Sequence, residues 1–154
     1  MHALDKAPPE GVQRVWTDGS QQQGTDGKEY AGYGVWFGEG HALNHRARLR
    51  GEVQTNNRAE MTAAIHALEV TLRTVALQIC VDSQLVTDGV TKWLEGWKRR
   101  SWKTKQNSEV ANKDLWQTLD GILEERQAQT SWINVPSHVG LHSNEMADRL
   151  AKKE

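Results

Sequence analysis

Four acidic residues stand where predicted secondary-structure elements begin or end. Asp18 follows the β-branched and aromatic run VWT, and Asp82 follows the apolar run ALQICV. Glu60 lies in the first turn of a predicted helix, and Asp148 lies within the last predicted helix. Carboxylates that converge without basic partners repel one another, so a cluster of this kind requires divalent cations. Oxygen ligands without cysteine favour Mg²⁺ or Mn²⁺ over zinc.

Each acid also has an ordinary structural interpretation. Asp18 and the glycine after it form a common hairpin-turn pair. Glu60 stands three residues after an asparagine and could complete a capping box, and Asp82 could cap the helix that it precedes. Asp148 could pair with the lysine four residues later. Taken together these interpretations are less favoured, because α/β proteins place ligands at the edge where the carboxyl ends of central strands open.

The pattern of apolar residues predicts a mixed α/β domain that would hold these acids. A helix is predicted where apolar residues repeat at intervals of three and four, namely Met61, Ala64, Ile65, Leu68 and Leu72. Strands are predicted at 12–18, 33–38, 42–51, 77–81 and 131–135, with a loop at 20–31. Further helices are predicted over QLVTDGVTKWLEGW and at 113–127 and 144–152. This order predicts an antiparallel front followed by parallel strands joined through helices.

Length and composition narrow the class of protein. The 154 residues suit one domain, and 25% charged with 37% apolar residues is typical of a globular chain. No apolar run approaches the ~20 residues of a membrane span, and the N-terminus lacks a signal-peptide core, so we expect an intracellular protein. The single cysteine, Cys80, lies in an apolar run and is predicted to be a buried, inert thiol.

A basic segment at 97–107, WKRRSWKTKQN, contrasts with the overall net charge of −1. It carries five basic residues and no acid, which favours contact with a polyanion. The alternative is a solvated helical face with tryptophans packed beneath it. We expect both to hold: Trp97 and Trp116 belong to the core, and Trp93 lies at the surface.

Six stretches of the chain resemble the motifs of type I ribonuclease H, in the ribonuclease H-like fold superfamily. They occur in the order of that family and span residues 12–152: TDGS (17–20), TNNRAEM (55–61), VDSQ (81–84), WKRRSWKT (97–104), VPSHVG (135–140) and NEMADRLA (144–151). The resemblance implies an α/β fold with a five-stranded mixed sheet flanked by helices. In that sheet the first three strands are antiparallel and the last two are parallel to strand one. It also implies a short tail at 1–11 and a single catalytic domain at 12–154, with a basic protrusion at about 97–107.

The resemblance further implies an activity. The expected reaction is endonucleolytic cleavage of the RNA strand of RNA–DNA hybrids, with two Mg²⁺ per active site and Mn²⁺ as a possible substitute. The expected ends are 5′-phosphate and 3′-hydroxyl, and the expected state is a cytoplasmic monomer with no membrane partner. Two alternatives stay open: another nuclease of the same fold, such as an integrase or junction resolvase, and a hybrid-binding module that has lost catalysis.

The family's functional residues map onto this sequence motif by motif. The implied metal ligands are the four acids, Asp18, Glu60, Asp82 and Asp148, and the implied mobile-loop histidine is His138. The implied substrate-binding residues are Thr55, Asn56, Asn57, Gln84, Trp93, Asn112, Lys98, Arg99, Arg100 and Lys103. Within that set, Thr55 and Asn112 match a pocket for a DNA phosphate. The chain departs from the pattern at Ser137, where a smaller residue is common, and at Val53, where some members place a phosphate-binding arginine.

Overall fold

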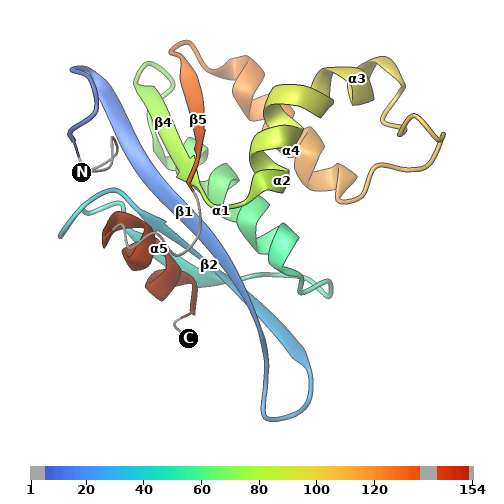
Figure 1. Ribbon diagram of the computed structural model, residues 1–154, viewed down its shortest axis with the longest axis horizontal. Coiled ribbons are helices and arrows are strands. Elements are labelled where there is room, and N and C mark those ends of the chain that lie inside the picture. The colour runs from blue at the N-terminus through green and yellow to red at the C-terminus, as the bar shows by residue number, and fades with distance from the viewer. Residues whose placement is uncertain (1–5, 136–141, 153–154) are drawn as a thin grey trace.

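The computed structural model describes residues 6–135 and 142–152, except for the side chains of residues 142–145 and 148. A five-stranded sheet forms the centre of the molecule, with helices on both faces (Figure 1). Its order is β3-β2-β1-β4-β5, with bounds Val12–Gln23 (β1), Glu29–Trp36 (β2), His45–Arg48 (β3), Ala76–Val81 (β4) and Thr130–Asn134 (β5). β1, β2 and β3 pair antiparallel, whereas β4 pairs parallel with both β1 and β5. The predicted fold class is therefore confirmed.

The first hairpin differs from the prediction. The segment 20–31 was expected to be a loop, but β1 continues to Gln23 and β2 already begins at Glu29. The pairing runs from Trp16 opposite Trp36 out to Gln23 opposite Glu29. The prediction failed because three successive strand residues, Gln21, Gln22 and Gln23, are polar and exposed, so they show no alternation of apolar and polar side chains.

Helices cover the two faces unequally. α5 (His142–Lys152) packs on β1 and β2 from one face, and α1 (Asn56–Val70) packs on β1, β2 and β4 from the other (Figure 1). α4 (Lys113–Glu125) lies against α1. The single helix predicted over QLVTDGVTKWLEGW is instead three pieces: α2 (Gln84–Asp88), a π-helical turn η2 (Gly89–Trp93) and α3 (Leu94–Arg99).

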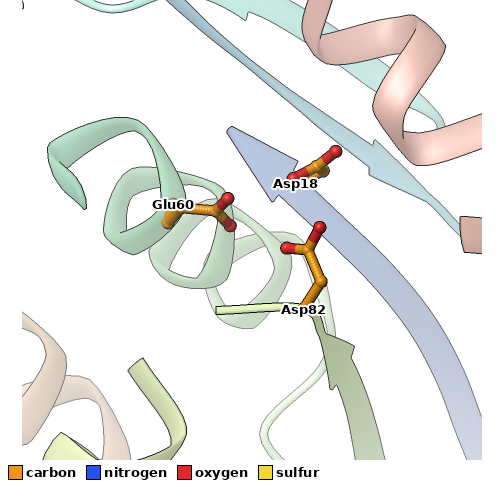
Figure 2. Close-up of side chains that lie close together, drawn as sticks. All are labelled: Asp18, Glu60 and Asp82. Atoms are coloured by element: carbon orange, nitrogen blue, oxygen red, sulfur yellow. The ribbon is translucent and has the colours of Figure 1, made fainter. Parts of the chain in front are cut away.

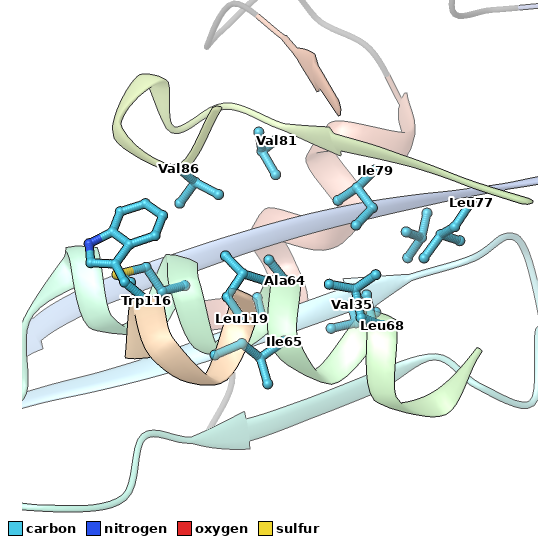
Figure 3. Packing of buried hydrophobic residues seen from close by; sticks show 14 of the residues in the cluster. Val35, Ala64, Ile65, Leu68, Leu77, Ile79, Val81, Val86, Trp116 and Leu119 are labelled. Carbon is cyan, nitrogen blue, oxygen red and sulfur yellow. The ribbon is translucent and has the colours of Figure 1, made fainter. Parts of the chain in front are cut away.

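The larger core lies between the sheet and α1. Small side chains on the buried side of α1, such as Ala64, let it approach the apolar strand residues Ile79 and Val81 (Figure 3). Trp116 and Leu119 of α4 pack into the same cluster. These contacts fix α1 against the sheet, and therefore fix the residues of its first turn.

A smaller core lies beneath α5. Trp16, Trp36, Cys80 and Ala147 pack together there. Cys80 is a free thiol, fully buried, and burial raises its pKa to about 12, which agrees with the inert role predicted for it. None of the described helices is long and apolar enough to cross a membrane.

Candidate active site

Parallel pairing of β1 with β4 brings Asp18 and Asp82 to one edge of the sheet. The paired register ends with Thr17 opposite Val81, so Asp18 and Asp82 are the next residues of the two chains. Asp18 was predicted to end its strand, which is wrong, because β1 continues and places it opposite Gly34 of β2. The strand that ends at this point is the neighbouring one, β4, whose last residue is Val81, and Asp82 follows it close to Asp18.

Glu60 is brought to this edge by the close approach of α1 to β1. A Cβ atom added at Gly19 would lie 2.6 Å from the backbone nitrogen of Glu60 and 2.8 Å from Cβ of Ala59. Gly19 is therefore a packing glycine. The turn of the β1–β2 hairpin lies at residues 24–28, where the Gly24 N–H donates to the Lys28 carbonyl at 2.7 Å. The turn interpretation of Asp18 and Gly19 is thus excluded.

The capping interpretations of Glu60 and Asp82 are excluded as well. Thr55 is the N-cap of α1, and its hydroxyl accepts from the Arg58 N–H at 3.2 Å. Ser83 is the N-cap of α2 and accepts from the Val86 N–H at 3.3 Å. Both helix starts are capped by hydroxyl residues, so the two acids serve another purpose.

The three carboxylates form a tight cluster (Figure 2). One oxygen from each of Asp18, Glu60 and Asp82 lies within 4.8 Å of the others. Asp18 is 3% and Glu60 is 4% exposed, whereas Asp82 is half-buried. Burial, together with the negative charge of Asp82, raises the pKa of Glu60 to about 8. A buried acid beside two others is costly to ionise in the absence of a cation.

The donor set fits a hard divalent cation. The Oε2 atom of Glu60 is buried and accepts no hydrogen bond from another described residue. The Oδ1 atom of Asp18 accepts a hydrogen bond from the Gly19 N–H at 2.9 Å, which helps to fix the orientation of its carboxylate. Buried acceptor oxygens that face one another match the coordination preferred by Mg²⁺ and Mn²⁺.

Two predicted site residues fall outside this geometry. Asp148 belongs to α5, but its side chain is not among those described. Its neighbour Ala147 packs closely on β2, since a Cβ at Gly34 would lie 2.5 Å from the Ala147 carbonyl oxygen. Gly34 is paired with Asp18, and residues paired in this way direct their Cβ atoms to the same face of the sheet. The backbone at position 148 therefore lies on the face to which the Asp18 side chain points. His138 lies outside the described residues altogether.

The residues predicted to contact the minor groove lie at two helix N-termini. Asn56 and Asn57 are the first two residues of α1, and Gln84 is the first residue of α2; all three are exposed. α1 and α2 contact each other, and each begins beside an acid of the cluster. The structure thus places these polar side chains at the first turns of the two helices that follow or carry Asp82 and Glu60.

The tryptophans divide as predicted between core and surface. Trp116 is buried and its ring lies 5.2 Å from that of Trp97, while Trp93 is 39% exposed with its ring 5.9 Å from Trp97. Trp93 therefore presents an aromatic surface that is supported from behind by the other two rings.

The basic residues of the segment 97–107 differ in whether their charges are paired with acids. Lys98 binds Glu124 at 2.8 Å and Asp120 at 3.2 Å, and Lys103 binds Glu109 at 3.0 Å. The hydrogen bonds to Glu124 and Asp120 raise the pKa of Lys98. Arg100 donates from Nε to the Lys103 carbonyl at 3.2 Å. Within the described chain, no ion pair involves Arg99 or Lys105, which are both exposed.

Sequence reasoning missed two residues that contact the predicted site. Gln21 of β1 accepts from the Asn56 N–H at 3.1 Å, and Arg58 of α1 donates to Asn112 at 3.2 Å. Gln21 gave no signal because it stands in a polar run that was assigned to a loop. Arg58 could have been found, because it lies inside the TNNRAEM stretch together with three of the predicted substrate-binding residues.

Comparisons with known proteins agree with this geometry. The family model described as RNase H matches residues 11–154. The chain is 40% identical to human "Ribonuclease H1" over 141 residues, which is 90% of this chain and 48% of the human protein. It is 42% identical to "Ribonuclease H" of Halorhodospira halophila over 144 residues, which is 93% of this chain and 92% of that protein. The chain therefore spans about half of the human relative and nearly all of the bacterial one.

Solved structures with a similar fold include two informative ones. LC9-RNase H1, described as a type 1 RNase H with the type 2 active-site motif, superimposes with a TM-score of 0.71 at 26% identity. The match covers 95% of this chain and 72% of that one. A foamy viral protease-reverse transcriptase in complex with RNA/DNA hybrid gives a TM-score of 0.72 at 17% identity, covering 98% of this chain and 21% of the viral chain. The second likeness shows the fold alone.

Proposed function

Since the chain belongs to the ribonuclease H family, we propose that it hydrolyses the RNA strand of RNA–DNA hybrids as an endonuclease. The products would carry 5′-phosphate and 3′-hydroxyl ends. The observation that carries this proposal is the cluster of Asp18, Glu60 and Asp82, whose oxygens lie within 4.8 Å of one another. A monomeric state and a cytoplasmic location stay predictions.

The carboxylates would hold the metal. Asp18, Glu60 and Asp82, joined by Asp148, are the residues that we assign to two Mg²⁺, with Mn²⁺ as a substitute. When bound there, such cations would supply charge neutralisation at the phosphate and activation of the attacking water. Asp18 is suited to a central position because β1 is the middle strand and its carboxylate is fixed by the Gly19 N–H. His138 would move a proton or assist product release, since an imidazole titrates near neutrality.

Recognition of the hybrid would come from the polar residues around the cluster. Asn56, Asn57 and Gln84 suit the wide minor groove, where the 2′-hydroxyls distinguish RNA from DNA. The Gln84 amide nitrogen donates to Asp88 Oδ1 at 2.9 Å, so its carbonyl oxygen is turned to accept from a hydroxyl. We assign Trp93 to the DNA strand, because its exposed ring is backed by Trp97.

The direct test is cleavage of matched substrates in Mg²⁺. A labelled RNA–DNA hybrid, duplex RNA, duplex DNA and a four-way DNA junction would be compared at equal concentration, and the product ends would be mapped. We expect cleavage of the hybrid alone, within its RNA strand. Cleavage of the junction or of duplex DNA would favour the other nucleases of this fold. Hybrid binding without cleavage would indicate a silent binding module.

The ion pairs of the basic segment predict which of its charges bind phosphates. Changing Arg99 and Lys105 to glutamine should lower hybrid affinity and reduce the slope of log K against log salt by about 0.9 for each phosphate that the variant no longer neutralises. The double variant Lys98→Gln/Glu124→Gln should leave that slope unchanged, because it removes one positive and one negative charge that form an ion pair and keeps the net charge of this surface. Both variants should keep wild-type turnover at saturating hybrid.

The measurement is a salt titration of hybrid binding, made in Ca²⁺ to hold off cleavage. Equal slopes for wild type and the Arg99/Lys105 variant would show that this segment is a solvated face. A reduced slope for the Lys98/Glu124 variant would show that the ion pair opens when the hybrid binds.

A further inference from the structure

Arg58 connects the first turn of α1 to the start of α4. Its guanidinium donates to both carboxylate oxygens of Asp114, at 2.9 and 2.8 Å, and to Oδ1 of Asn112 at 3.2 Å. Its backbone N–H donates to the Thr55 hydroxyl. One residue therefore contacts both members of the predicted DNA-phosphate pocket, Thr55 and Asn112.

The contact with Arg58 settles the orientation of the Asn112 amide. A guanidinium carries donors only, so the amide atom that faces it must be the oxygen. The NH₂ group then points away from Arg58, and within the described chain it donates to no other residue. Although Asn112 is at the N-cap position of α4, its side chain does not cap that helix.

The backbone at Asn112 also indicates a function beyond capping. Its φ of 58° and ψ of 32° lie in the left-handed region, which asparagine tolerates better than most residues do. A glycine would adopt this conformation at lower cost. The asparagine is thus explained by its amide, which is bound to Arg58 on one side and offers donors on the other.

The Thr55 hydroxyl, like the Asn112 NH₂ group, has a hydrogen that it can donate to a ligand. Its hydroxyl oxygen accepts the Arg58 N–H at 3.2 Å, so its own hydrogen is left to be donated. Together the two residues offer N–H and O–H donors, which suits a group with several acceptor oxygens and a negative charge. A phosphate has this character.

We propose that Arg58 is a positioning residue that holds the Asn112 amide with its NH₂ group toward a phosphate of the DNA strand, beside the Thr55 hydroxyl. This inference rests on the proposed function. Some family members have a phosphate-binding arginine where this chain has Val53, which is 56% exposed. The inference therefore explains how the pocket can be formed without that arginine. Arg58 acts through Asn112, because its own charge is matched by the bidentate pair with Asp114.

The competing explanation is a purely structural ion pair between two helices. The hydrogen bond from Arg58 lowers the pKa of Asp114, so both groups are charged at neutral pH. However, Asp114 is 66% exposed, and exposed ion pairs contribute little to stability. The variant Asp114→Asn separates the two explanations, because it removes the ion pair and keeps the Arg58–Asn112 contact.

The experiment is steady-state cleavage of a hybrid by wild type and four variants: R58M, D114N, N112G and R58M/N112G. We expect R58M to raise KM for the hybrid about ten- to a hundredfold, the effect of losing one hydrogen bond to a charged group, with kcat within about twofold of wild type. N112G keeps the left-handed backbone and should match R58M. The double variant should show no further rise, because the two residues act as one unit. D114N should not raise KM, because it keeps the Arg58–Asn112 contact and leaves the Arg58 charge unmatched, which favours phosphate binding.

Several outcomes would overturn the inference. Additive effects of R58M and N112G on KM would show that Arg58 does not act through Asn112. Equal KM increases in R58M and D114N, accompanied by a lower melting temperature, would assign Arg58 to the structural ion pair. Cleavage with wild-type KM in R58M would overturn the inference alone, whereas no hybrid cleavage by the wild type would overturn the proposed function with it.

Discussion

Replacing Asp18 with asparagine is expected to lower the rate of hybrid cleavage by at least ~10³-fold while leaving the fold intact. The substitution removes a negative charge from the most central of three clustered carboxylates. An asparagine has the same shape, and its oxygen can still accept from the Gly19 N–H. Asp82→Asn should have a similar effect, because Asp82 borders the same cluster from β4.

The rate would be measured in single-turnover cleavage at saturating Mg²⁺, alongside circular dichroism and thermal unfolding. Without metal, D18N should melt at or above the wild-type temperature, since repulsion between like charges is relieved. Glu69→Gln is the matched control, because Glu69 is an exposed acid on the same helix as Glu60. An unfolded D18N, or one with near-normal turnover, would return Asp18 to a structural role.

The order of the elements and the convergence of Asp18, Glu60 and Asp82 were predictable from the sequence. Apolar alternation over 77–81 and the three-and-four repeat of α1 reflect burial, which is a local property of the pattern. Because β1, β2 and β3 alternate in direction and α1 connects β3 to β4 as a crossover, β4 runs parallel to β1. Once those strands are neighbours, Asp18 and Asp82 must meet, whatever the exact strand bounds are.

Features that depend on contacts between distant residues were not predictable. The π-helical turn at 89–93 faces Trp116 of α4, and a Cβ at Gly89 would lie 2.0 Å from that indole ring. Likewise, Lys98 forms its two shortest ion pairs with acids more than 20 residues away on α4, Asp120 and Glu124, and a longer one with Glu95. A basic run shows its charges but not their partners, so the ion pairs of Lys98 and Lys103 could not be predicted from it.

The packing of Gly19 against α1 is another contact between distant residues that the sequence did not predict. Changing Gly19 to alanine is expected to lower turnover by about 10²-fold, the effect of a misplacement of roughly 1 Å in the site. The added Cβ would lie 2.6 Å from the Glu60 nitrogen and 2.9 Å from the Ala59 carbonyl carbon. Both are backbone atoms of α1, so no side-chain rotation relieves the contact. α1 must move away from β1, and Glu60 moves with it, away from Asp18.

The same substitution should lower the free energy of unfolding by about 1–3 kcal/mol, the usual range for overpacking. Gly121→Ala is the matched control, because Gly121 lies within α4 with nothing within 4 Å of its added Cβ. That control should gain about 0.5–1 kcal/mol, since alanine favours a helix over glycine, and it should keep full activity. Urea unfolding and single-turnover cleavage measure the two effects separately. If G19A kept wild-type turnover, catalysis would not depend on the distance between Glu60 and Asp18. Glu60 would then have to be removed from the proposed metal ligands, which would leave Asp18 and Asp82 of the three clustered acids.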